Sequence, residues 1–152
     1  MRTVQNILDS KAKPFNQIAP DTLVIEALNL LNSLNLSYLV VLDGDQYKGI
    51  FSERDYSRKV ILKGRHSDST TVAEVMSTDI PVIGLEDTAE HCMNLMEQSK
   101  SRYLLAFDEN KRLAGVVTIH DILRLVLKDK GEVFDREIAG RLVDEDESGR
   151  VY

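Results

Sequence analysis

The stretch GIFSERD at residues 49–55 recurs later in the chain as GVVTIHD at residues 115–121. Each copy has a glycine, two apolar residues, a hydroxyl residue, two variable residues and an aspartate. A short apolar run bounded by a glycine favours a buried strand, and a hydroxyl residue is a preferred helix N-cap. Each copy therefore predicts a strand that leads directly into a helix.

The segments that precede each junction are repeated as well. Amphipathic turns at residues 3–8 and 71–76 both open with a capping threonine, and the acidic-threonine pairs at 21–22 and 87–88 occupy positions that cap a following helix. An apolar stripe then predicts a helix with one buried face in each copy. The stripe residues are Leu23, Ala27, Leu30, Leu31 and Leu34 in the first copy and Ala89, Cys92, Met93 and Met96 in the second.

Apolar runs at residues 38–42 and 103–107 are too short for helices and predict buried strands. A turn joins each run to the strand of its junction, so each copy contains a hairpin. The predicted fold class is α/β, or more strictly α+β, with two β-α-β-β-α repeats. Because neither half can bury a large core alone, we expect the repeats to pack as a pseudo-twofold pair with a binding cleft between them.

The duplication sets the expected domain boundaries. Residues 1–66 form the first repeat and residues 67–130 form the second. The remaining segment, 131–152, has apolar residues at four-residue steps and then an acidic run, which predicts a C-terminal helix followed by an acidic tail.

Composition excludes several classes of protein. The net charge of −6 gives no long-range attraction for nucleic acid. No apolar run has the roughly 20 residues of a membrane helix, and the N-terminal residues lack the apolar core of a signal peptide, so we expect a cytoplasmic protein. Cys92 is the sole cysteine and is expected in the core. We predict no metal site, no catalytic residue and no catalytic cofactor, because the chain has no phosphate loop, paired metal-spaced histidines or nucleophile-base set.

The junctions carry the chemistry of a binding site. The hydroxyl residue and the aspartate three positions later fit a capping box, which needs no ligand. Arg54 and His120, just before each aspartate, are cations in the first turn of a helix, where the dipole disfavours them. An external phosphate at both helix starts would account for them, and an aspartate nearby could accept the hydroxyls of a ribose. Pairing of Arg54 with Glu53 is a competing explanation, and the residues alone leave the site and the capping box open.

These duplicated junctions resemble those of the CBS domain family, whose tandem pair is called a Bateman module. The resemblance extends from about Thr3 to Lys130, and the run FSERDYSRK at residues 51–59 is particularly similar to that of small stand-alone members. It implies that the hydroxyl and cationic residues face phosphate, that the aspartates hold ribose, and that neighbouring strand residues line the base. The implied ligand-binding residues are Ser52, Arg54, Asp55, Tyr38, Ile50 and Ile18 for one site and Thr118, His120, Asp121, Arg102, Tyr103, Val116 and Val82 for the other.

The resemblance further implies a function without catalysis. The chain is expected to be a regulatory sensor that binds an adenine nucleotide between the repeats, with AMP ahead of ADP and ATP. It is expected to form a homodimer and to signal to a regulated protein, without contacting nucleic acid or a membrane. The alternatives are a binder of S-adenosylmethionine or NAD(H), and a ligand-free dimerisation scaffold, because function belongs to the site and not to the fold.

Overall fold

The computed structural model describes residues 2–129 and divides into two compact units. Unit 2 is the continuous stretch Phe15–Ile80, and unit 1 combines Met1–Pro14 with the chain from Pro81 onward. The helix and acidic tail predicted for residues 131–152 lie outside the described residues.

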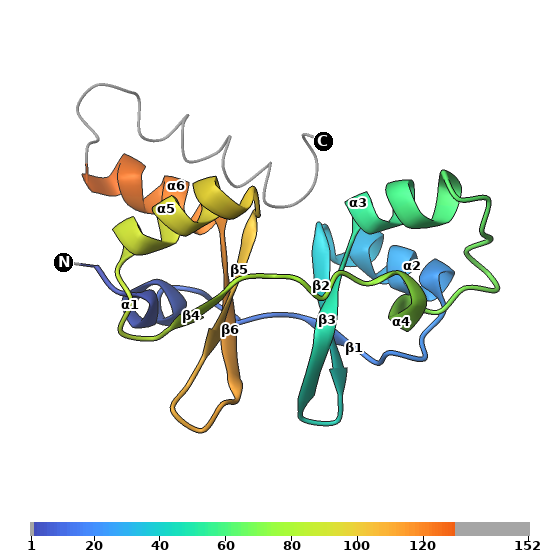
Figure 1. Ribbon diagram of the computed structural model, residues 1–152, viewed down its shortest axis with the longest axis horizontal. Coiled ribbons are helices and arrows are strands. Elements are labelled where there is room, and N and C mark those ends of the chain that lie inside the picture. The colour runs from blue at the N-terminus through green and yellow to red at the C-terminus, as the bar shows by residue number, and fades with distance from the viewer. Residues whose placement is uncertain (1, 130–152) are drawn as a thin grey trace. The chain divides into compact units, whose positions relative to one another are not determined.

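Unit 2 contains one small sheet with helices around it (Figure 1). Its elements are β1 (Gln17–Ile18), α2 (Val24–Leu34), β2 (Tyr38–Asp43), β3 (Gln46–Ser52), α3 (Glu53–Asp55), the π-helix η1 (Tyr56–Ile61) and α4 (Val72–Val75). The strand order is β1-β2-β3, with β1 parallel to β2 and β3 antiparallel to β2.

Unit 1 has the same arrangement and is built mainly from the second half of the chain. Its elements are α1 (Val4–Asp9), β4 (Val82–Gly84), α5 (Ala89–Ser99), β5 (Tyr103–Phe107), β6 (Leu113–Thr118) and α6 (Ile119–Asp129). The strand order β4-β5-β6 has the same directions as in unit 2. The predicted fold class, with two β-α-β-β-α repeats, is confirmed.

The two short opening helices are exchanged between the repeats. Helix α1 precedes the first repeat, but Val4, Ile7 and Leu8 belong to the core of unit 1, next to β6 (Figure 1). Helix α4 precedes the second repeat, but Val72 and Val75 belong to the core of unit 2. Each compact unit therefore takes its opening helix from the other sequence repeat.

Two local predictions about α2 and α5, the helices that carry the apolar stripes, are wrong. Thr88 caps α5 as predicted, accepting a hydrogen bond from the backbone of His91 (3.1 Å), but α2 has Leu23 as its N-cap and no side-chain cap. Here the backbone is held by pairing instead, because the Val72 N–H donates to the Thr22 carbonyl and Leu23 bridges Thr71.

The apolar stripe also includes two residues that are not buried. Leu34 is 50% exposed because it lies in the last turn of α2, and Met93 is 45% exposed because it lies one position round the helix from Cys92. Cys92 itself is fully buried, as expected.

The helix after the first junction differs from its counterpart. Helix α3 has only three residues before the chain widens into the π-helix η1, whereas α6 is a regular α-helix of eleven residues. A π-helix bonds each residue to the one five positions back; it is rare in proteins and often occurs at functional sites. The two junctions, although alike in sequence, therefore lead into different helices.

Among residues 2–129, no helix combines the length and the apolarity needed to span a bilayer. The same part of the chain holds no group of three or more histidine, cysteine or acidic side chains arranged to bind a metal.

Candidate functional site

Both junctions form the reciprocal hydrogen bonds of a capping box. At the first, the Asp55 N–H donates to Ser52 Oγ (3.3 Å) and the Ser52 N–H donates to Asp55 Oδ2 (2.9 Å). At the second, the Asp121 N–H donates to Thr118 Oγ1 (3.2 Å) and the Thr118 N–H donates to Asp121 Oδ2 (2.8 Å). All four residues are buried. The capping function inferred for the hydroxyl residues and aspartates is thus present, and each aspartate has further partners as well.

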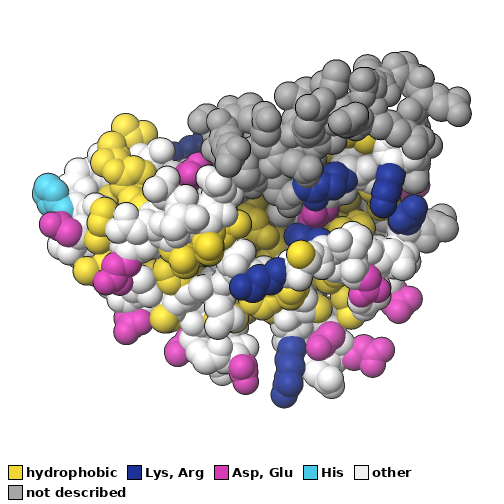
Figure 2. Space-filling view, turned by 180° about the vertical axis from the view of Figure 1, so that it is seen from behind, with side chains coloured by type: hydrophobic (Ala, Val, Ile, Leu, Met, Phe, Trp, Pro, Cys, Tyr) yellow, Lys and Arg dark blue, Asp and Glu magenta, His cyan; other side chains and the backbone are white. Residues whose placement is uncertain are grey.

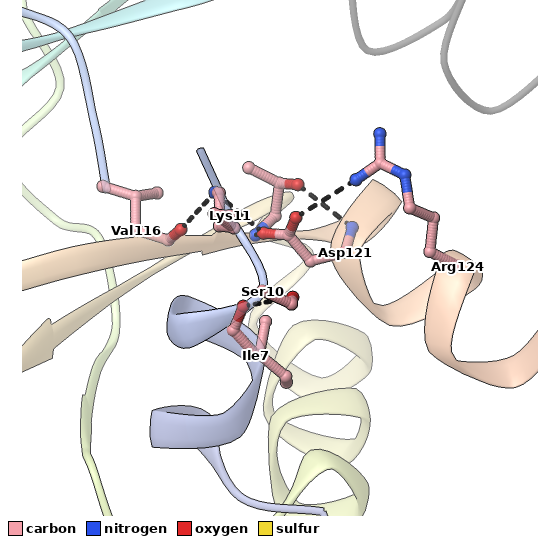
Figure 3. Close-up of polar contacts among 7 residues, drawn as sticks. Ile7, Ser10, Lys11, Val116, Asp121 and Arg124 are labelled. Atoms are coloured by element: carbon pink, nitrogen blue, oxygen red, sulfur yellow. Dashed lines mark hydrogen bonds and ion pairs between the residues drawn. The ribbon is translucent and has the colours of Figure 1, made fainter. Parts of the chain in front are cut away.

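Asp121 is held by a lysine from the start of the chain (Figure 3). Lys11 Nζ lies 3.0 Å from Asp121 Oδ2 and also donates to the Val116 carbonyl at 2.9 Å. Arg124, one turn along α6, approaches Asp121 Oδ1 to 3.5 Å from the other side. The carboxylate is therefore buried between two cations, which compensates the cost of removing its charge from water.

Asp55 is held by different partners. Asp55 Oδ1 accepts a hydrogen bond from Ser77 Oγ (2.7 Å) and pairs with Lys59 Nζ (3.0 Å), which projects from η1. Lys59 Nζ also contacts Ser77 Oγ at 3.1 Å. Ser77 follows α4, so Asp55 joins the start of α3 to the segment that leaves the exchanged helix.

The glycine of each motif is explained by the exchanged helices. A Cβ atom at Gly115 would lie 2.7 Å from a methyl carbon of Leu8, at the end of α1. A Cβ atom at Gly49 would lie 2.8 Å from the Ser77 carbonyl oxygen and 2.9 Å from the side chain of Met76. At Gly49 the obstacle includes backbone, so only glycine lets the chain after α4 approach the strand this closely, whereas at Gly115 the Leu8 side chain of α1 fills the space that a Cβ atom would need.

Most of the predicted apolar site residues share one face of each sheet. The register pairs Tyr38 with Ser52 and Val40 with Ile50 in unit 2, and alternate residues of a strand point to the same side. In unit 1 the register likewise pairs Tyr103 with Thr118. This is the face opposite the helix-packed core, which is formed by neighbours such as Leu39, Phe51, Leu104 and Val117.

The row across the sheet of unit 1 runs through Val82, Leu105 and Val116. Val82 is 59% exposed and Val116 is fully buried. The same row in unit 2 begins at Gln17, not at Ile18, because Gln17 pairs with Val40. Ile18 lies on the other face, packed against the core of unit 2. The structure therefore brings Val82 to the face of the other site residues but does not bring Ile18 there.

The two predicted cations lie in different environments. Arg54 is exposed, and within residues 2–129 it forms no ion pair with Glu53, so that competing explanation is not supported. His120 is buried, with 5% of its surface exposed. Arg102, which precedes β5, is half-buried. The cationic positions match in sequence but only Arg54 is open to solvent.

Sequence reasoning missed the partners of the aspartates. Lys59 is four residues after Asp55, a spacing that favours an ion pair on a helix, so this contact had a local signal. Lys11 and Ser77 had none, because their bonds to the aspartates close long loops of chain.

Comparison with known proteins agrees with this geometry. The family model described as "CBS domain" matches twice, at residues 10–61 and 72–128. The CBS domain-containing protein CBSX3, mitochondrial, of Arabidopsis thaliana is 31% identical over 88% of this chain and 69% of its own length. The crystal structure of the CBS domain NE2398 superposes with a TM-score of 0.77 at 30% identity, covering 84% of this chain and 99% of that one.

The fold and the matched junctions define a tandem CBS-domain protein. The chain belongs to the CBS domain family, with two copies of the domain. A second solved structure, described as CBSX2 in complex with AMP, has the same fold, with a TM-score of 0.69 at 24% identity over 86% of this chain and 99% of that one.

Proposed function

We propose that this chain is a non-enzymatic regulatory module that binds an adenine nucleotide, AMP or else ADP or ATP, at its strand-to-helix junctions. The observation that carries the proposal is a buried carboxylate, Asp121, paired with a hydroxyl residue at the start of an eleven-residue helix. Backbone N–H groups at such a helix start favour phosphate, and a carboxylate there can accept sugar hydroxyls. The complex of CBSX2 with AMP, a protein of the same fold, supports an adenine nucleotide as the class of ligand.

The face on which Thr118 lies suits the base of a nucleotide. It carries Tyr103, Leu105 and Val116, an aromatic and two apolar side chains in adjacent register positions. Binding sites for small molecules combine such apolar walls with a few polar groups that fix orientation. The proposed ligand would place its base on the strands and its sugar and phosphate at the helix start.

The test is a titration of the intact chain with AMP, ADP, ATP, S-adenosylmethionine and NADH by calorimetry and thermal shift. We expect saturable stabilisation by an adenine nucleotide, which Asp121→Ala should abolish. Asp87→Ala is a matched control, because Asp87 accepts a hydrogen bond from the Gly84 backbone (2.7 Å) away from the junctions. It should lower stability without removing binding. Absence of any shift at millimolar ligand would refute the proposal.

A ligand-free scaffold is the second candidate, and one observation favours it. Asp55 is paired with Lys59 and Asp121 with Lys11, so the negative charge of each carboxylate is balanced by the protein itself, without a ligand. On this hypothesis the junctions serve only to hold the exchanged segments. The same titration separates the two candidates, because a scaffold responds to none of the five compounds.

We also propose that the chain forms a homodimer through apolar helix surfaces. Leu62 is 75% exposed and Ile61 55% exposed, and Leu123 on α6 is 43% exposed. Figure 2 shows hydrophobic side chains reaching the surface in several places on one face. Sedimentation equilibrium should give twice the chain mass, and Leu62→Glu or Leu123→Glu should shift it towards one chain. A single-chain mass at all concentrations would contradict the dimer.

A further inference from the structure

The chain connects the two units twice, and each connection is attached to an equivalent residue of a sheet. The first connection, residues 10–14, is bonded to Val116, and the second connection, residues 77–80, is bonded to Ile50. Each of these residues follows the motif glycine and lies on an edge strand, β6 or β3. At both positions the backbone N–H donates to a carbonyl of the connection, so these are matching attachment points.

The second connection is attached by a complete backbone bridge. The Ile50 N–H donates to the Ser77 carbonyl (2.9 Å), and the Ser77 N–H donates to the Ile50 carbonyl (2.8 Å). Pro14 has the equivalent place in unit 1, because its carbonyl accepts a hydrogen bond from the Val116 N–H (3.4 Å). Proline has no N–H, so Pro14 cannot donate in return to the Val116 carbonyl.

Lys11 supplies the donor that Pro14 lacks (Figure 3). Lys11 Nζ donates to the Val116 carbonyl at 2.9 Å and pairs with Asp121 Oδ2 at 3.0 Å. Val116 is fully buried, and a buried carbonyl without a donor is costly. The Lys11 side chain is itself only 13% exposed, so its charge depends on Asp121 for compensation. A side-chain cation therefore does in unit 1 what a backbone N–H does in unit 2.

We propose that Lys11 is a latch: it holds the first connection to unit 1, and release of Lys11 detaches this connection while the second connection stays attached. Without Lys11, the first connection keeps at Val116 only a hydrogen bond of 3.4 Å, which is longer than the usual range of about 2.7–3.2 Å. Opening the latch lengthens the free chain between the units without unfolding either core. The proposal does not depend on a bound nucleotide.

The lysine of the other junction has a different role. Lys59 pairs with Asp55 (3.0 Å) and contacts Ser77 Oγ (3.1 Å), but it projects from η1 and is not part of a connection. Its contact with Ser77 adds to a backbone bridge that is complete without it. The two junctions, each with a lysine paired to its aspartate, therefore differ in whether the lysine carries the attachment.

The test measures amide hydrogen exchange by NMR in the full chain without nucleotide. The Val116 N–H and the Ile50 N–H each report one attachment, because each donates to a connection. In the unaltered chain Val116 should be less protected than Ile50. Lys11→Met should lower the protection of Val116 relative to that of Ile50 by about 10- to 100-fold, the range for loss of a hydrogen bond to a charged group.

Three further variants are matched controls. Lys13→Met removes an exposed lysine that forms no ion pair within residues 2–129, and it should leave the relative protection unchanged. Lys59→Met should lower the protection of Ile50 by less than about threefold, because the backbone bridge remains. Combining Lys11→Met with Pro14→Ala places a backbone N–H beside the Val116 carbonyl, and it should restore part of the protection of Val116.

The relative protection of the two amides decides the proposal. A fall of less than about tenfold in Lys11→Met, or an equal fall in Lys13→Met, would overturn the latch. If Lys11→Met does not fold, the unaltered chain still gives a test, since stronger protection at Val116 than at Ile50 would contradict the proposal. Because no nucleotide is present, these outcomes are independent of the titration that tests the proposed function.

Discussion

Replacing the motif glycines by alanine should destabilise the protein unequally. At Gly49 the new Cβ would meet the Ser77 carbonyl oxygen at 2.8 Å, and this backbone is fixed by two hydrogen bonds with Ile50, at 2.9 and 2.8 Å. At Gly115 the Cβ would meet a methyl carbon of Leu8 at 2.7 Å, which is the far end of a flexible side chain. The first obstacle is rigid and the second can move.

The magnitudes follow from these neighbours. Overpacking of a core costs about 1–3 kcal/mol, and each backbone hydrogen bond that must lengthen adds about 0.5–1.5 kcal/mol. Because both hydrogen bonds with Ile50 are affected, we expect Gly49→Ala to lower the free energy of unfolding by about 2–6 kcal/mol. Gly115→Ala should cost only about 0.5–1.5 kcal/mol, because Leu8 can relieve the contact by turning its side chain about 30° from its rotamer.

Urea denaturation followed by circular dichroism measures both changes. A double-mutant cycle gives the control: Gly115→Ala should be partly rescued when Leu8 is replaced by alanine, with a coupling energy of about 0.5–3 kcal/mol. Met76→Ala should rescue Gly49→Ala less, since the Ser77 backbone still blocks the Cβ. Equal costs at the two glycines, or no coupling between Gly115 and Leu8, would refute the explanation of the motif by the exchanged helices.

Three further predictions concern single positions. Lys100→Gly should raise the free energy of unfolding by about 0.5–1 kcal/mol in urea denaturation, because Lys100 ends α5 at a φ of 55°, which disfavours residues with a side chain. Asn35→Gly, at the same φ, should raise the free energy of unfolding by less, because asparagine tolerates this conformation better, and equal increases would contradict the explanation. Burial and the charge of Asp79 raise the pKa of Tyr47 to about 12, so the stability that the protonated Tyr47 contributes should be lost as the pH rises from about 10 to 12. Asp79→Asn should lower this pKa in an NMR titration of the Tyr47 ring, and an unchanged pKa would exclude the contribution of Asp79. Burial, with a smaller effect of the Asp87 charge, raises the pKa of Cys92 to about 11. At a pH of about 8 the native protein should therefore react slowly with a thiol reagent that labels the urea-unfolded chain rapidly, and equal labelling rates would show that the thiol is accessible.

The sequence was sufficient for the order of elements because each depends on local patterns. The apolar runs of β2 and β5 and the capping residues Ser52 and Thr118 are short-range signals, and the structure confirms them. It was not sufficient for the exchange of α1 and α4. Leu8 and Met76 occupy equivalent positions in the two sequence copies, so either could pack against either sheet as far as the pattern shows.

The same limit applies to the site. The capping boxes lie within four residues and could be predicted, but Lys11 reaches Asp121 from the far end of the chain. Register also mattered, since a shift of one residue separates Ile18 from the position equivalent to Val82. Contacts between distant segments could not be predicted, and these include the partners of both aspartates, Lys11 for Asp121 and Ser77 for Asp55.

The exchange of the opening helices limits how the molecule can be dissected. Unit 2 is an uninterrupted piece of chain inserted into unit 1, so the polypeptide passes between them twice, after Pro14 and after Ile80. A fragment cut between the sequence copies would carry α1 without the strand it covers and would lack α4, leaving apolar surface bare at both places. A truncation that keeps both cores intact must therefore cut the chain after Pro14 and after Ile80. A fusion or split reporter placed near residue 66 would separate α4 from the core of unit 2 instead of interrupting a linker.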